Sequence, residues 1–147
     1  MGAVSHGPWA RLLARAGLVA AGGAVGTALR AALENAAPAA PGGWPWTTFG
    51  INLLGSFVLG ALLEVVLRTG QDEGWRRRVR LGCGTGVLGG FTTYSTFVVE
   101  VERLLTGGHP GIGLAYALVS VVVGIVCALL GITMVRSLPR GQKEEGA

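Results

Sequence analysis

Residues 82–97 read GCGTGVLGGFTTYSTF and lie within the third of four long apolar segments. Five of these residues are glycines, which weaken a helix, and a run of hydroxyl and aromatic side chains follows them. The combination predicts that the third helix is broken near its middle. Irregular backbone at membrane depth survives only where protein buries it or where it lines a wet cavity. We therefore expect a packing surface, a binding site, or both at this break.

The rest of the chain has the composition of a membrane protein. Half of its 147 residues are hydrophobic and 14% are charged, against about 25% charged residues in soluble domains. Each apolar segment is close to the ~20 residues that cross a bilayer. We predict one all-α membrane domain over residues 1–147, with four transmembrane helices that need an oligomer to bury their polar groups. The expected helices are 16–33, 46–67, 79–104 and 112–135, with flexible tails at 1–10 and 137–147.

The positive charges are distributed unevenly between the two sides of such a four-helix chain. Ten of the twelve Lys and Arg residues fall on one side, and only Arg30 and Arg103 fall on the other. By the positive-inside rule, this predicts a plasma-membrane protein of one fixed orientation with both termini in the cytoplasm. We therefore attribute the net charge of +4 to the orientation of the protein in the membrane and do not expect nucleic-acid binding.

A few polar residues interrupt the apolar segments. Asn52 shares a helix face with Thr48, and it either holds helices together or faces a polar path, because an unpaired amide in the membrane is costly. Arg30 lies near a helix end, where it either reaches to water or attracts anions at a pore mouth. Glu64 and Arg68 are spaced as a surface ion pair.

Neutral hydrogen-bond donors occur on three of the expected helices, together with the rings of Tyr94 and Phe97. Such donors solvate anions, and the positive edge of an aromatic ring contacts them as well. The pattern predicts a narrow path for a small anion. No nucleophile–base pair or metal cluster is present, and the G-x-G-x-x-G match at residues 84–89 has no preceding strand, so an enzyme is not expected. The donors are Thr48, Asn52, the Thr and Ser residues of 92–96, Tyr116 and Ser120.

Three stretches together resemble the Fluc/CrcB fluoride channel family. They are GGAVGTALR at residues 22–30, TFGINLLGSF at 48–57 and GGFTTYSTF at 89–97. The resemblance implies an antiparallel, dual-topology dimer whose two pores export toxic cytoplasmic fluoride. It also implies a structural, untransported sodium ion at the dimer centre, held by the backbone carbonyls of Gly89 and Thr92.

The resemblance also assigns side chains to the pores. The paired pore phenylalanines of the family fall on Tyr94 and Phe97, and Tyr116 matches its fourth-helix tyrosine. Arg30 is expected in the vestibule of the pore, that is, at the pore mouth. The polar track falls on Asn52, Thr93, Ser95, Thr96 and Ser120.

Two residues depart from the family pattern. Tyr94 stands where the family usually has Phe, and Gly124 stands where a second serine is expected. Together with the charge bias, this suggests that the chain is one half of a heterodimer whose partner inserts the opposite way. A homodimer needs both orientations of one chain, which a strong charge bias opposes.

Two other classes of protein compete with the channel interpretation. A small four-helix drug/proton antiporter needs a carboxylate within the membrane, but the first helix has no acidic residue before Glu34, and Glu64 and Glu100 lie near helix ends. A purely structural subunit, whose glycines only pack helices, leaves the donors and the rings without a role.

Overall fold

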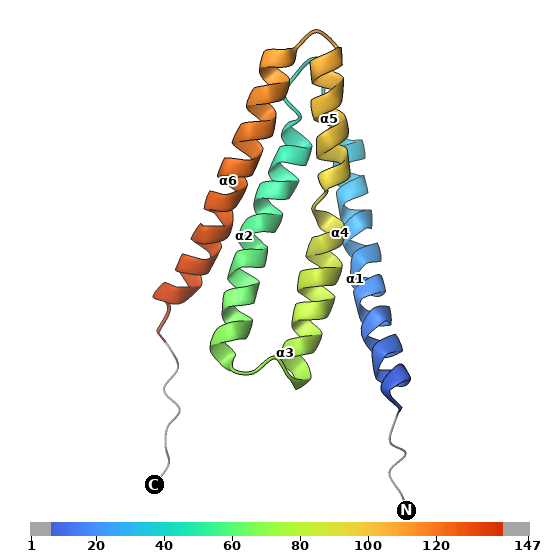
Figure 1. The fold of residues 1–147 in the computed structure, drawn as a ribbon, viewed down its shortest axis with the longest axis vertical. Coiled ribbons are helices and arrows are strands. Elements are labelled where there is room, and N and C mark those ends of the chain that lie inside the picture. The colour runs from blue at the N-terminus through green and yellow to red at the C-terminus, as the bar shows by residue number, and fades with distance from the viewer. Residues whose placement is uncertain (1–6, 140–147) are drawn as a thin grey trace, which may run out of the picture.

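The structure is a computed structural model that describes residues 7–139. Every regular element within that range is a helix, and the long ones run side by side (Figure 1). The beginning of α1 and the end of α6 lie at the same end of the molecule (Figure 1). In chain order the elements are α1 (Pro8–Ala36), α2 (Trp46–Thr69), α3 (Gly74–Val79), the π-helix η1 (Arg80–Leu88), α4 (Gly89–Phe91), α5 (Tyr94–Thr106) and α6 (Pro110–Ser137).

Three of these helices, α1, α2 and α6, are long and apolar enough to cross a membrane. The third apolar segment is divided, as predicted: α3, η1 and α4 end at Phe91, and α5 begins at Tyr94. Thr92 and Thr93 between them have extended backbone, with ψ angles of 154° and 122°. The break is therefore confirmed, and it lies directly after the glycines and not among them.

The helix boundaries differ from the expected ones chiefly at the two ends of the molecule. Helix α1 begins at Pro8, because proline in the first helical position has no amide that needs a partner. The basic connection before the third segment contains the short helix α3. Of the two expected tails, residues 1–6 and 140–147 lie outside the described residues.

The glycines before the break allow α1 to pack closely on η1 and α4. A side chain at Gly22 would meet the carbonyl of Gly82, and one at Gly26 would meet the carbonyl of Val87. Gly90 abuts the backbone of Gly23 in the same way. Small residues at such spacing let backbones approach in a membrane, where packing and not hydrophobic burial drives association. The glycine-rich stretch is thus a packing surface on one face.

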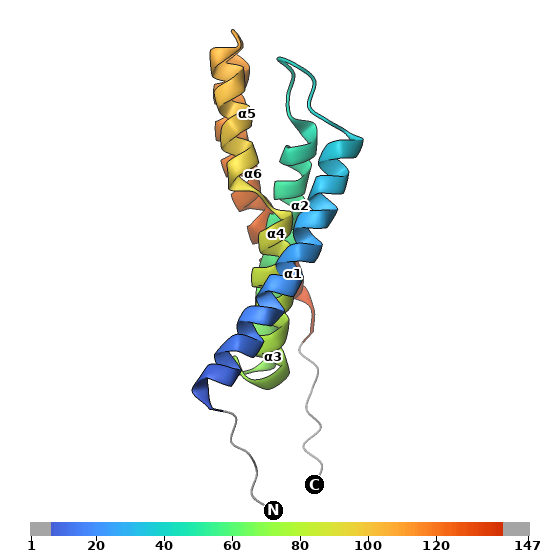
Figure 2. The same cartoon turned by 90° about the vertical axis from the view of Figure 1, so that its right-hand side faces the viewer.

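Helices α2 and α6 meet through a second set of small residues. A side chain at Gly60 would meet the carbonyl of Ala128, and one at Gly131 would meet the carbonyl of Phe57. Helix α5 runs back along α6 on the other side of the break, and in Figure 2 the two diverge from α1. The α1–α2 connection, the first turn of α2 and helix α5 surround a hollow in this part of the molecule.

The predicted ion pair between Glu64 and Arg68 is wrong. Glu64 is only 8% exposed and bonds Arg136 of α6 instead, at 3.1 Å. Arg68 donates to the carbonyls of Val135 and Leu138, the latter at 2.9 Å. The last carbonyls of a helix have no partner within it, and an arginine from a neighbouring helix satisfies them here.

Candidate functional site

The amide of Asn52 holds the break in place. Its Nδ2 donates to the carbonyl oxygen of Thr93 at 3.0 Å, and its Oδ1 accepts from the backbone N–H of Thr93 at 2.8 Å. The backbone N–H and the backbone carbonyl of Thr93, a buried residue outside the helices, are thus both hydrogen-bonded to one side chain. From the sequence, Asn52 is expected either to hold helices together or to face a polar path. These hydrogen bonds show that it holds α2 to the break, and its side chain also borders a groove described below.

Hydroxyl groups end one helix at the break and begin the next. Thr92 Oγ1 donates to the carbonyl of Leu88 at 2.9 Å, which closes the last turn of α4. Thr93 Oγ1 accepts from the N–H of Thr96 at 3.1 Å and so caps α5. It also lies 3.3 Å from Ser95 Oγ and 3.1 Å from Thr96 Oγ1. The hydroxyl run therefore forms a connected cluster at the N-terminus of α5.

Two carbonyl groups at the break have no donor. In an unbroken helix the N–H of Thr93 would bond the carbonyl of Gly89, but here it bonds Asn52. Within residues 7–139, no N–H or hydroxyl donates to the carbonyl oxygens of Gly89 and Thr92. The family resemblance implies cation ligands at these same two residues.

A groove of about 310 Å³ crosses the break on the face made by α2, α5 and α6. The rings of Tyr94 and Phe97 lie there with centroids 6.2 Å apart, and Tyr94 is 80% exposed. Ser120 Oγ is buried and has no hydrogen-bond partner among the described residues. The groove brings together most of the predicted polar track. Its lining is Asn52, Gly55, Ser56, Leu59, Thr92, Thr93, Tyr94, Phe97, Ser120 and Val121.

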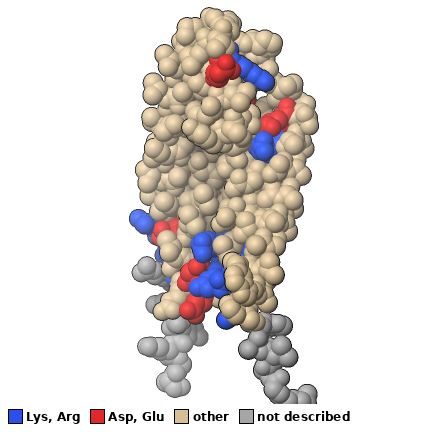
Figure 3. All heavy atoms as spheres, turned by 45° about the vertical axis from the view of Figure 1, so that its right-hand side comes forward, with Lys and Arg blue, Asp and Glu red and all other residues tan. Residues whose placement is uncertain are grey.

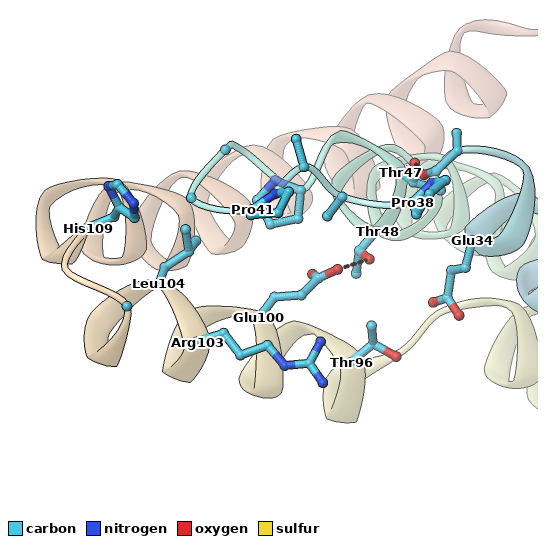
Figure 4. Close-up of a pocket in the computed structure, with 17 residues that line it drawn as sticks. Glu34, Pro38, Pro41, Thr47, Thr48, Thr96, Glu100, Arg103, Leu104 and His109 are labelled. Carbon is cyan, nitrogen blue, oxygen red and sulfur yellow. Dashed lines mark hydrogen bonds between the residues drawn. The ribbon is translucent and has the colours of Figure 1, made fainter.

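A second hollow of about 640 Å³, here called the vestibule, lies between the α1–α2 connection and α5 (Figure 4). Its lining includes Thr48, Thr96, Glu100 and Arg103, with His109 at one end (Figure 4). Thr96 therefore lines the vestibule, while Phe97, the next residue, lines the groove. The first turn of α5 separates the two hollows.

Glu100 is the residue that sequence reasoning left out of the site. Its two carboxylate oxygens accept hydrogen bonds from Thr48 Oγ1 at 2.6 Å and from Tyr116 Oη at 2.8 Å. The carboxylate thus holds two of the predicted anion donors. The available signal was its spacing, since Glu100 follows Thr96 by one helical turn and so shares its face.

Tyr116 is fully buried within a cluster of rings. Phe97 lies 5.2 Å from it and Trp44 lies 5.4 Å from it, edge to face. Phe97 therefore has one neighbour in the groove, Tyr94, and one in the protein interior. Trp44, in the α1–α2 connection, packs inward against this cluster.

Arg30 lines neither hollow. Its Nε donates to the carbonyl of Gly90 at 3.3 Å, and its Nη1 pairs with Glu34 at 3.2 Å. Thr27 Oγ1 donates to the same carbonyl at 3.4 Å. Arg30 is thereby tied to the last turn before the break, and its predicted role at a pore mouth stays a prediction.

Comparisons with known proteins agree with the motifs at the break. A family described as "CrcB-like protein, Camphor Resistance (CrcB)" matches residues 17–132. The chain is 48% identical over 120 residues to "Fluoride-specific ion channel FluC 1" of Cutibacterium acnes, covering 82% of this chain and 84% of the relative. It is 50% identical over 117 residues to "Fluoride-specific ion channel FluC 2" of Leifsonia xyli, covering 80% of each.

A third relative, "Fluoride-specific ion channel FluC" of Deinococcus radiodurans, is 47% identical over 115 residues, which cover 77% of this chain and 88% of the relative. All three names describe channels and not enzymes. The matched region runs from α1 to α6 and includes the break, both hollows and the donors around them. The chain belongs to the CrcB family of membrane proteins.

Proposed function

We propose that this chain is a subunit of a fluoride channel that lowers cytoplasmic fluoride by letting it leave passively through the plasma membrane. The observation that carries the proposal is the polar first turn of α5, exposed by the break and bordered by a hollow on each side. The names of the relatives, all fluoride-specific channels, supply the ion. In this arrangement the divided third segment is a fourth span, and both termini are cytoplasmic.

The path we propose leads from the vestibule, past the first turn of α5, into the groove. The N-terminus of a helix carries partial positive charge and amides without partners, which favours an anion near Thr93 and Ser95. Hydroxyl donors and the ring edges of Tyr94 and Phe97 replace water around the ion without fixing it, because none of them carries a full charge. Neutral, closely spaced donors thus allow fluoride to bind and to leave.

Glu100 imposes a condition on this path. Its carboxylate accepts the hydroxyl hydrogens of Thr48 and Tyr116, which an incoming anion would also need. We infer that the side chain of Glu100 turns away when fluoride enters the vestibule, so that these hydroxyls become free to solvate the ion. The α1–α2 connection leaves room for such a movement, since the vestibule holds about 640 Å³.

A sodium ion bound at the break fits the residues present. Carbonyl oxygen is a suitable ligand for a hard cation, and the carbonyls of Gly89 and Thr92 have no donor within residues 7–139. One chain offers two such oxygens, so a fuller set of ligands needs a second subunit at the same place. A sodium ion there would hold two subunits together and would not be transported.

The open groove supports a dimer. Tyr94 is 80% exposed within it, which leaves an aromatic pore residue without a second wall. We propose that an antiparallel partner covers this face. The bias of ten Lys and Arg against two opposes insertion of the same chain in both orientations, so the partner is a homologous chain of opposite bias. The antiporter alternative is set aside because the chain belongs to the CrcB family.

Reconstitution in liposomes tests both parts of the proposal. Liposomes loaded with potassium fluoride, made permeable to potassium with an ionophore, should release fluoride when they contain this chain and a partner of opposite charge bias. With this chain alone, release should stay near that of protein-free liposomes. Rapid release by the single chain would refute the heterodimer but support the channel, and no release with either preparation would refute the channel.

A further inference from the structure

The first two turns of α1 extend beyond the packed part of the molecule as an amphipathic helix. Trp9, Leu12 and Leu13 are spaced to share one face, and they are 75%, 54% and 71% exposed. Arg11 and Arg15 occupy the opposite face, are exposed, and form no ion pair with any described residue. A helix of this composition at the end of a span is suited to the headgroup layer, with its apolar face towards the acyl chains.

Helix α3 lies at the same end of the molecule (Figure 1) and is also basic. Arg77 and Arg80 are occupied, because both contact the carboxylate of Asp72, at 3.4 Å and 2.8 Å. The Arg80 guanidinium holds the pKa of Asp72 below its ordinary value of 3.8, so the carboxylate is ionised at neutral pH. Arg78 is exposed and has no ion-pair partner within residues 7–139.

Two tryptophans accompany these arginines. Trp75 of α3 is 50% exposed and Trp9 of α1 is 75% exposed. The Arg76 guanidinium carbon lies 5.3 Å from the ring centroid of Trp75. On the face shown in Figure 3, charged side chains gather at the lower end, a few others lie in the upper half, and a band without them separates the two groups. Because α1, α2 and α6 are apolar enough to span the membrane, arginines beyond the ends of these spans lie near the depth of lipid phosphates.

We propose that Arg11, Arg15 and Arg78, exposed at the same end of the molecule, bind the headgroups of anionic phospholipids, with Trp9 and Trp75 as anchors at the membrane interface. Juxtamembrane arginines attract anionic lipid by about 1 kcal/mol each, which corresponds to about fivefold in affinity. The guanidinium group forms paired hydrogen bonds with phosphate oxygens and suits such a headgroup. Arg77 and Arg80 contribute less, because Asp72 neutralises them.

Native mass spectrometry of the detergent-solubilised protein, titrated with phosphatidylglycerol or phosphatidylcholine, tests this proposal. The wild type should retain phosphatidylglycerol preferentially, and neutralising Arg11, Arg15 and Arg78 to glutamine should weaken that binding by about fivefold for each arginine. Arg103→Gln, at the opposite end of the molecule, serves as the control and should change little. Equal retention of the two lipids, or equal binding by the wild type and the triple variant, would overturn the proposal.

A pair of neighbouring acidic residues gives a test that a folding defect cannot imitate. Asp72→Asn and Glu73→Gln change the net charge equally, but only the first releases Arg77 and Arg80 from an ion pair. Asp72→Asn should therefore strengthen phosphatidylglycerol binding by about fivefold or more, well beyond Glu73→Gln. An equal response would mean that net charge alone acts. Inorganic phosphate should compete weakly if a lipid is the ligand, and displacement of lipid at low phosphate would instead assign these arginines to free phosphate.

Discussion

Replacing Asn52 by leucine removes both hydrogen bonds that hold the break between α4 and α5. The change removes the side-chain partners of the N–H and the carbonyl of Thr93, a residue that is only 7% exposed. Each buried polar group left unsatisfied costs about 1–3 kcal/mol. The free energy of unfolding should therefore fall by roughly 2–6 kcal/mol, which is a large part of the stability of a small protein.

The measurement is equilibrium unfolding in mixed micelles, followed by the loss of helical signal. Ser56→Ala is the matched control, because Ser56 lines the same groove on the same helix and its hydroxyl bonds no described residue. Asn52→Gln, which retains the amide, should lose less stability than Asn52→Leu. If Asn52→Leu unfolds at the same denaturant concentration as Ser56→Ala, Asn52 does not hold the break and the reasoning fails.

Three further changes test the packing and the pore. Gly26→Ala places a methyl group against the carbonyl of Val87 and should lower the free energy of unfolding by about 1–3 kcal/mol or more. Gly50→Ala, with no neighbour within 4 Å, is the control and should not destabilise the protein. Equal thermal midpoints of the two variants would contradict the close approach of α1. Glu64→Gln should destabilise by about 1 kcal/mol, because Glu64 is 8% exposed while its partner Arg136 is largely solvated, and the same unfolding assay measures it. Tyr94→Phe removes an exposed hydroxyl and should leave stability within about 0.5 kcal/mol of the wild type. Because the family usually has Phe at this position, the change should raise fluoride efflux. An unchanged rate would show that the hydroxyl does not reach the anion.

The broken third helix is the part of the fold that the sequence predicts best. Glycine and threonine in an apolar segment are local signals, and they indicate an interruption within a few residues of Thr92. The position of the break also depends on Asn52, which lies 41 positions away in the chain, and no local pattern contains that pairing. The glycines before the break let α1 pack closely, because Gly22 and Gly26 of α1 lie directly against the backbone of that stretch.

Charged residues near helix ends were harder to place. Glu64 and Arg68 have the spacing of a helical ion pair, but Glu64 pairs with Arg136 of α6 and Arg68 donates to carbonyls at the end of α6. Glu100 has polar neighbours only after α2 and α6 are packed against α5. Spacing within one helix determines which residues share a face, and the partner of that face is fixed only by the tertiary fold.

The most direct test of the account compares fluoride and chloride efflux from the same liposomes, recorded with two ion-selective electrodes. With the chain and a partner of opposite charge bias reconstituted together, fluoride should leave rapidly while chloride is retained, and Phe97→Ala should slow fluoride release. Retention of both ions, or equal release of both, would contradict a fluoride path past the broken helix.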